Sequence, residues 1–144
     1  MSYNEIENIL SHLLTKEHEV LDKPTNKEWE SLSNKFNCSF SDEFKWFIEL
    51  MASWSFPGDI YNVSTKRNNG NDMIEEVYNH EMQHGNWKED MIPFYGIGNG
   101  DYFCISSLDA KVYYYYEDKD KFEEYCVDFE QWIKELPDFL EGNL

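Results

Sequence analysis

One stretch of the sequence has the residue types and spacing that zinc chemistry requires, namely His80-Glu81-Met82-Gln83-His84. Two histidines one helical turn apart can bind the same zinc ion, and the intervening glutamate can polarise a zinc-bound water. A catalytic zinc needs a third protein ligand, but the position six residues beyond the second histidine holds Asp90. The third ligand would have to come from Glu117, Asp118 or Asp120. We therefore favour an exposed polar helix end over a small zinc-dependent hydrolase.

The other candidate patterns argue against catalysis. His12 and His18 have no nucleophile near them in the sequence, and no serine or cysteine lies in the glycine pattern of a nucleophile elbow. Gly96-x-Gly98-x-Gly100 is followed by β-favouring residues, whereas a phosphate-binding glycine loop opens a helix. The three cysteines are odd in number and far apart, which argues against a disulfide framework and a paired-cysteine metal site. We expect no enzyme, no cofactor and no bound metal ion.

A tyrosine-rich strand followed by acidic residues is the candidate binding surface. Tyr113–Tyr116 place two tyrosines on each face of a strand, and such side chains bury a large area on binding. The interpretation that we favour for the strand itself is that one face is core and the other lies under a helix. Residues 117–144 hold ten acids and three lysines, which form either a solvated face or a patch for a basic partner. The residues that we expect to contact a partner are Tyr114, Tyr116, Glu117, Asp118 and Asp120.

Charge and composition limit the classes of partner. The 144 residues include 29 acids and 12 bases, for a net charge of −17, so a protein that binds phosphate backbones directly is disfavoured. The same charge suits a basic protein partner, and it also suits solubility alone. The N-terminal residues carry acids where a signal peptide carries bases, and no apolar run approaches the roughly 18 residues of a membrane helix. We expect a cytoplasmic protein that binds neither nucleic acid nor membrane.

In the N-terminal half, capping residues and apolar spacing predict three helices. Ser2 and Glu5 have capping-box spacing ahead of an amphipathic helix over residues 3–14, and a polar connector follows to residue 24. Thr25 and Glu28 repeat that spacing before a short helix with Trp29, Leu32 and Phe36 on one face. Ser41 is the expected cap of a third helix, which is apolar over a wide arc and is therefore predicted to be the central buried helix.

In the C-terminal half, runs of β-favouring residues predict strands that lie between two helices. Residues 60–63 suit a strand and residues 64–71 a loop, and Asp72 is the expected cap of a helix that ends near His84. Residues 91–95 predict a strand, the glycines a corner, and residues 102–105 and 112–116 a hairpin. After a charged turn at 118–121, apolar residues recur at helical spacing from Phe122 to Leu136, and Pro137 is expected to end that helix. We expect one domain over residues 1–144, with residues 137–144 as a frayed tail.

Several of these segments, taken in order, resemble a known group of proteins. Five pieces between residues 25 and 136 together look like the SUKH superfamily: Phe40–Phe47, Met91–Phe94, Gly100–Ile105, Lys111–Tyr113 and Val127–Ile133. Fungal members of that superfamily are known as regulators of cell-wall synthesis, and many bacterial members as immunity proteins against polymorphic toxins. The resemblance implies a single α+β domain with a mixed or mostly antiparallel sheet flanked by helices.

The resemblance also implies a function. It implies no catalysis and, for bacterial members, neutralisation of a cognate toxin by direct binding. Together with the net charge, it predicts a non-enzymatic immunity protein whose partner is a basic toxin domain, for example a nuclease. The alternatives are the zinc hydrolase built on His80, Glu81 and His84, and an intracellular scaffold or regulator of the fungal kind.

Overall fold

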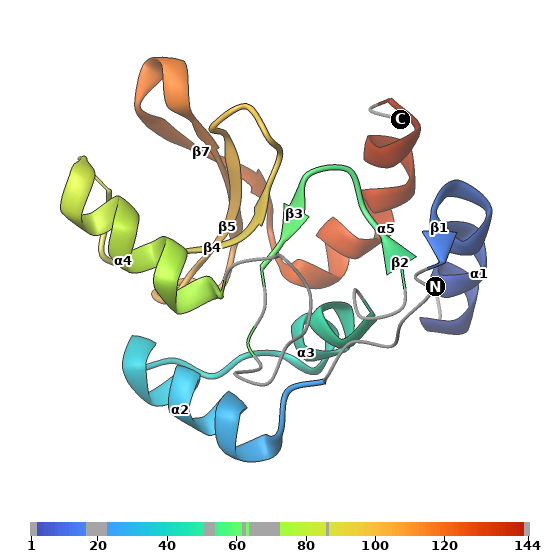
Figure 1. The fold of residues 1–144 in the computed structure, drawn as a ribbon, viewed down its shortest axis with the longest axis horizontal. Helices are drawn as coiled ribbons and strands as arrows, with labels where there is room; N and C mark the ends of the chain where they lie inside the picture. Colours follow the sequence, from blue (N-terminus) through green and yellow to red (C-terminus); the bar gives the residue numbers. More distant parts are fainter. Residues whose placement is uncertain are drawn as a thin grey trace.

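The structure, a computed structural model, describes residues 3–16, 23–50, 54–61, 63, 73–85 and 87–142. Within them, most helices precede a regular sheet and one helix follows it (Figure 1). The elements are, in chain order, α1 (Tyr3–Leu13), β1 (Thr15–Lys16), α2 (Asn26–Phe36), α3 (Asp42–Leu50), β2 (Trp54–Ser55), β3 (Asp59–Ile60), α4 (Ile74–His84), β4 (Met91–Gly96), β5 (Tyr102–Ser106), β6 (Val112–Tyr116), a 3₁₀ turn η1 (Glu117–Lys119), β7 (Lys121–Cys126) and α5 (Phe129–Glu141).

The strands β3 to β7 form one sheet in which all neighbouring pairs are antiparallel. Their order in the sheet is their order in the chain, and β4 to β7 are joined by the short connections that antiparallel neighbours allow. The predicted hairpin is confirmed, because Tyr102 pairs with Tyr115 and Ile105 pairs with Val112. The expected α+β fold is confirmed as well, with an antiparallel rather than a mixed sheet.

Helices cover both faces of this sheet. In Figure 1, α4 lies beside one face and α5 beside the other, with α3 below α5. The phenol of Tyr102 donates a hydrogen bond to Glu81 of α4 at 2.9 Å, whereas the ring of the next residue, Phe103, lies 5.4 Å from Trp132 of α5. Because successive side chains of a strand point to opposite faces, β5 is covered from both sides.

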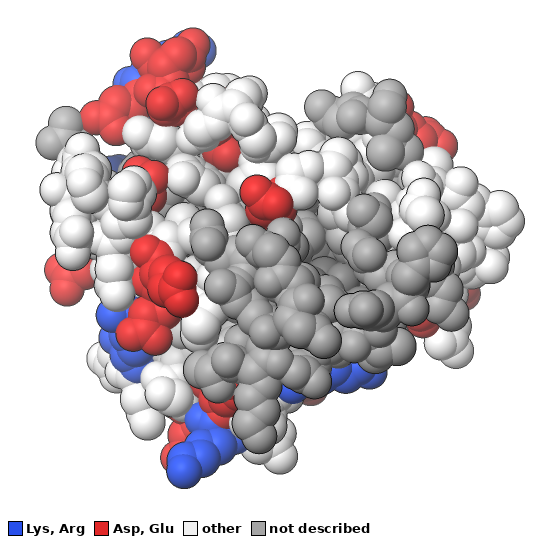
Figure 2. Space-filling view, viewed as in Figure 1, with Lys and Arg blue, Asp and Glu red and all other residues white. Residues whose placement is uncertain are grey.

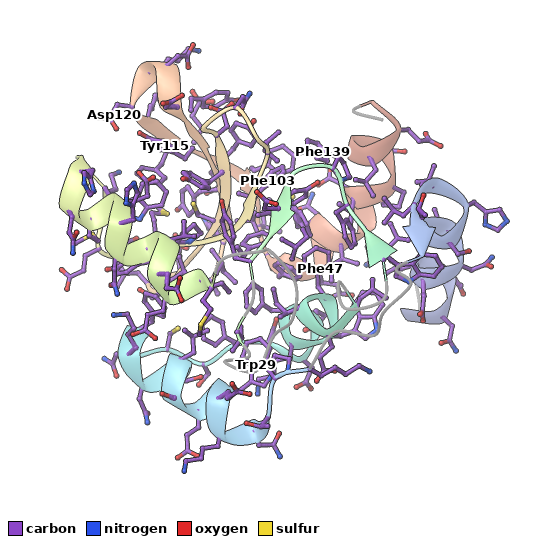
Figure 3. The ribbon with its side chains drawn as sticks, viewed as in Figure 1. Trp29, Phe47, Phe103, Tyr115, Asp120 and Phe139 are labelled. Atoms are coloured by element: carbon purple, nitrogen blue, oxygen red, sulfur yellow. The ribbon has the colours of Figure 1, made fainter. Side chains whose placement is uncertain are left out.

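The core is built from aromatic side chains of α3, β4 and α5. The ring of Phe94 lies 5.6 Å from that of Phe44, 5.3 Å from that of Phe129 and 5.1 Å from that of Trp132, in edge-to-face contacts. Such contacts add to the stabilisation that burial of the rings provides. Phe47 lies in the same cluster, which Figure 3 shows between the helices and the sheet. The prediction that the third helix is the central buried one is confirmed.

Local capping signals in the sequence identify where two helices start. The Thr25 hydroxyl accepts a hydrogen bond from the N–H of Glu28 at 3.2 Å, and the Glu28 carboxylate accepts one from the N–H of Thr25 at 3.0 Å, which completes a capping box. The Ser41 hydroxyl accepts a hydrogen bond from the N–H of Phe44 at the start of α3. The expected cap Asp72 and the expected loop at 64–71 lie outside the described residues; α4 begins at Ile74.

The segment after η1 corrects the prediction of a helix from residue 122 onward. Lys121–Cys126 form β7, which pairs with β6, and α5 begins only at Phe129, where Asp128 accepts a hydrogen bond from the N–H of Gln131 at 2.8 Å. The helical spacing of Phe122 and Tyr125 misled the prediction, since three residues along a strand place them on opposite faces. Their rings accordingly pack on different partners across the sheet.

The helix end at Pro137 is also corrected. Pro137 lies inside α5, which continues to Glu141, and Leu140 is completely buried. An interior proline costs about 3 kcal/mol of helix stability, but burying Leu140 stabilises by about 1.5–3 kcal/mol, and the partly buried Phe139 adds to this. The ring of Phe139 lies 5.2 Å from Phe103, so both apolar residues of the last turn hold it on the sheet (Figure 3). Residues 137–141 are therefore not a frayed tail.

We predict that Leu140→Ala lowers the free energy of unfolding by about 2–5 kcal/mol, because it leaves a cavity in a packed site. The matched control is Leu108→Ala, whose side chain is 83% exposed and whose loss should change the stability by less than about 0.5 kcal/mol. Urea unfolding followed by tryptophan fluorescence measures both variants. Equal stabilities of the two variants would mean that the last turn of α5 does not contribute to the fold.

Candidate functional site

The turn between β6 and β7 presents the expected contact residues. η1 carries Glu117 and Asp118, and Asp120 closes the turn in the left-handed conformation at φ 49°, which aspartate tolerates better than most residues. The N–H of Asp120 donates to the carbonyl of Glu117 at 3.2 Å, and the phenol of Tyr115 donates to the Asp120 carboxylate at 2.7 Å (Figure 3). We call residues 117–120 together with Asp101 the acidic lobe.

Asp101 holds the acidic lobe on the sheet. One of its carboxylate oxygens accepts the N–H of Glu117 at 2.9 Å, and the other accepts the phenol of Tyr114 at 2.9 Å. The preceding Gly100 lies at φ 95°, and a Cβ there would fall 2.3 Å from a carboxylate oxygen of Glu117. The exposed Glu117 side chain can move away from such a Cβ, so it is the left-handed conformation that favours glycine at this corner. Sequence reasoning missed Asp101 as a site residue, although Asp101 directly follows the glycine corner and lies in the Gly100–Ile105 segment.

The four tyrosines of β6 divide between two environments. Tyr114 and Tyr116 lie on one face with ring centroids 4.7 Å apart, and both are half-buried. Tyr115 lies on the other face, where it is 7% exposed and its ring lies 4.9 Å from Trp87 and 4.8 Å from Phe122. The strand therefore contributes Tyr115 to the core, whereas Tyr114 and Tyr116 are partly exposed, and their contact with a partner stays a prediction.

The tyrosines beside the acidic lobe are neutral hydrogen-bond donors. Burial raises the pKa of Tyr114 above its usual range, and the hydrogen bond to the Asp101 carboxylate raises it further. The pKa of Tyr115 is raised in the same way, by burial and by the hydrogen bond to Asp120. Because the phenols keep their protons at neutral pH, they hold the carboxylates in place without cancelling their charge.

Most of the negative charge on the acidic lobe faces solvent. Glu117 and Asp118 are exposed, and neither takes part in a salt bridge within the described part of the chain. Of the two nearby lysines, Lys119 lies over the ring of Tyr116 at 5.2 Å, and Lys121 pairs with Glu123 at 3.1 Å. Figure 2 shows acidic side chains gathered at the end of the molecule where Figure 1 places this turn. The structure therefore brings Tyr114, Tyr116 and the three predicted acids into one surface.

The histidine pair of α4 has the geometry of an ordinary helix end. The rings of His80 and His84 stack at 4.3 Å, and a ring nitrogen of His84 lies 2.8 Å from the carbonyl of His80. The Glu81 carboxylate accepts the phenol of Tyr102, on the side of α4 that faces the sheet. Among the residues that the structure describes, there is no group of three or more His, Cys, Asp or Glu side chains that could hold a metal ion. The described residues therefore supply no third ligand for a zinc ion beside His80 and His84.

The five-stranded sheet flanked by helices agrees with a comparison against protein families. The family model SUKH_5, described as SMI1-KNR4 cell-wall, matches residues 6–138, which is nearly the whole chain. The chain belongs to the SUKH superfamily. The resemblance drawn from the five sequence segments is thereby confirmed. No curated protein matches the sequence.

Membership supports a general type of role for this SUKH chain. The family supports an immunity or SMI1-KNR4-like protein, and SUKH domains are generally non-enzymatic, with a protein such as a toxin as the partner. None of the helices that the structure describes is both long and apolar enough to cross a membrane. The acidic lobe is the candidate surface for a protein partner, and Asp101 is the residue that shapes it.

We predict that Asp101→Asn lowers the free energy of unfolding by about 1–3 kcal/mol. The amide keeps one acceptor oxygen but turns an N–H₂ group toward one of the two donors that the carboxylate now satisfies. It also removes the charge that raises the pKa of Tyr114, so that pKa should fall while burial keeps it above the ordinary value. Urea unfolding and an NMR titration of the tyrosine rings measure the two effects.

The matched control for this variant is Asp118→Asn. It makes the same chemical change at an exposed position of the acidic lobe, so its stability should stay within about 0.5 kcal/mol of the parent. If both variants unfold alike and the Tyr114 pKa is unchanged, Asp101 does not anchor the lobe.

Proposed function

We propose that this SUKH chain is a cytoplasmic, non-enzymatic immunity protein that neutralises a cognate toxin by binding it. Membership of the SUKH superfamily is the observation that carries the proposal. The partner is a basic toxin domain, such as a nuclease, and the contact surface is the acidic lobe with Tyr114 and Tyr116. The carboxylates occupy the basic surface on which the toxin holds its own substrate.

The charge of the chain supports a basic partner. A net charge of −17 produces a field that accelerates encounter with a protein of opposite sign. Enzymes that act on nucleic acid carry Lys and Arg to neutralise phosphates, and exposed carboxylates such as Asp118 can pair with the same cationic groups. Binding at that surface excludes the toxin's substrate without any reaction by the immunity protein.

The order of the acidic lobe supports tight binding. Its main chain is held by Asp101, and its turn is closed by the hydrogen bond between Tyr115 and Asp120. A surface that is already ordered loses less conformational entropy on association than a flexible acidic tail would. Tyr116 adds an aromatic ring that already accepts one cation, the ammonium group of Lys119. A partner arginine or lysine can use the same ring.

We predict that Asp118→Lys weakens binding to the toxin domain encoded beside this gene by about tenfold or more, because it places a positive charge against a basic surface. The matched control is Glu30→Lys, at an exposed position of α2, and Figure 1 shows α2 at the opposite end of the molecule from the turn that precedes β7. Both variants change the net charge by the same amount, so their difference measures local contact. Affinity of the parent should fall as the salt concentration rises.

The assay is a titration of the purified toxin domain with each variant, together with a growth-protection test. The absence of both binding and protection for the parent protein would refute the proposed function. Equal weakening by the two variants would place the contact elsewhere, and tight binding that ignores salt would refute an electrostatic surface.

A further inference from the structure

Within the described part of the chain, the outer edge of β7 has no neighbouring strand. β7 is the last strand of the sheet and pairs only with β6 among the described strands. Its register with β6 is regular from Lys121 to Glu124 and shifts at Tyr125, which has no partner residue in the pairing. A strand with a neighbour on one side directs every second N–H and C=O group to the other side, where it can pair with a further strand.

The side chains along this edge alternate between a carboxylate and an aromatic ring on each face. Phe122 and Glu124 lie on the face toward α4, and Glu123 and Tyr125 lie on the face toward α5. Tyr125 is 43% exposed. The side chains of an added strand would lie about 4.5–5.5 Å from these residues. Arginine and lysine suit such neighbours, because their cations pair with a carboxylate and stack on a ring.

Lysines of this chain already contact a ring and two carboxylates of β7, and all these contacts are exposed to solvent. Lys88 lies over the ring of Phe122 at 5.6 Å, Lys111 pairs with Glu124 at 2.8 Å, and Lys121 pairs with Glu123 at 3.1 Å. Exposed ion pairs contribute little to stability, so replacing these lysines by cations of a partner costs little. The contacts show which chemistry the edge accepts on both faces.

We infer that β7 binds an extended, basic segment of the partner protein, which adds to the sheet as a further strand. Backbone hydrogen bonds to the outer edge of Lys121–Glu124 hold the segment, and its Lys or Arg side chains pair with Glu123 and Glu124. The inference rests on the proposed function and deepens it, because it names the mode of binding and the chemistry of the partner segment. Seven acids and two lysines lie between residues 117 and 130, so a basic strand is favoured and a second copy of this acidic edge is repelled.

The first test uses a synthetic peptide on the free protein, an eight-residue chain of alternating arginine and threonine. Its matched control has the same sequence with N-methyl groups on alternate backbone nitrogens, which keeps the charge and removes the hydrogen bonds along one edge. Two such controls are used, one with methyl groups on the odd-numbered nitrogens and one on the even-numbered nitrogens. Only one of these two sets faces β7 when the peptide is bound. We expect the parent peptide to slow the exchange of alternate amide hydrogens in β7, and one control to bind about tenfold more weakly or worse.

Three results would overturn the inference. They are no binding of the parent peptide, equal binding of all three peptides, and binding that leaves the exchange of the β7 amides unchanged. The last two would mean that the acidic surface attracts cationic peptides without strand addition. None of these results bears on whether the toxin domain binds, since the acidic lobe can bind it without β7.

The second test uses two proline variants, Glu123→Pro and Glu124→Pro. Adjacent residues in a strand direct their N–H groups to opposite edges, so one variant removes an N–H that faces β6 and the other an N–H that faces outward. Both remove one carboxylate, so they are matched in charge. We expect the outward variant to fold with near-parent stability and to lose peptide binding by about tenfold or more. A variant that folds like the parent and binds the peptide equally well would overturn the inference.

Discussion

The burial of β4 on both faces is the constraint on which the rest of the structure depends. All six residues from Met91 to Gly96 are buried, so the sheet must be covered on both sides near β4. Phe94 is enclosed by side chains of α3 and α5. The opposite face is covered by α4 and by Trp87, which follows α4 and whose indole N–H donates to the carbonyl of Met91. Pro93 is accommodated in this central strand because the pairing with β5 shifts its register between Pro93 and Tyr95. In Figure 1, the end of the sheet at which β7 begins extends beyond the helices that flank the sheet.

Several carboxylates of this acidic chain accept a hydrogen bond from a tyrosine phenol. Among the described residues, tyrosine phenols donate to carboxylates in the pairs Tyr102 to Glu81, Tyr113 to Asp109, Tyr114 to Asp101 and Tyr115 to Asp120. A lysine in the same positions would neutralise each acid, whereas a phenol orders it and leaves its charge. The hydrogen bond from Tyr113 to Asp109, followed by burial, raises the pKa of that phenol to about 12, so it stays neutral in the physiological range. The tyrosines therefore account for an ordered surface that remains strongly negative.

What the sequence predicts and what it misses follow from the range of the interactions. The capping box of Thr25 and Glu28 and the hairpin of β5 and β6 are set by residues close in sequence, and both were predicted. The register of the hairpin, which pairs Tyr102 with Tyr115, could not be predicted from the turn residues. β7 was missed because pairing with β6 overrides a helical spacing that Phe122 and Tyr125 share by coincidence. The continuation of α5 past Pro137 depends on contacts of Phe139 with Phe103, which no local pattern reveals. The exposed acids were found from composition and turn chemistry, but their anchor, Asp101, lies 16 residues from the N–H of Glu117 and depends on the sheet register.

The acidic lobe and the edge of β7 belong to one continuous surface, because η1 leads directly into β7. A strand added to Lys121–Glu124 runs antiparallel or parallel to β7, and in either direction one of its ends reaches the turn that carries Asp118 and Asp120. In the proposed mode of binding, cations at that end meet the exposed carboxylates of the turn, while cations within the strand meet Glu123 and Glu124. Backbone pairing then provides orientation, since charge alone does not fix how two surfaces meet. The carboxylates contribute attraction and selectivity, since they repel acidic edges such as that of a second copy. In the proposed mode of binding, a single hairpin, β6–η1–β7, thus provides both the backbone edge and the negative charge that recognise the partner.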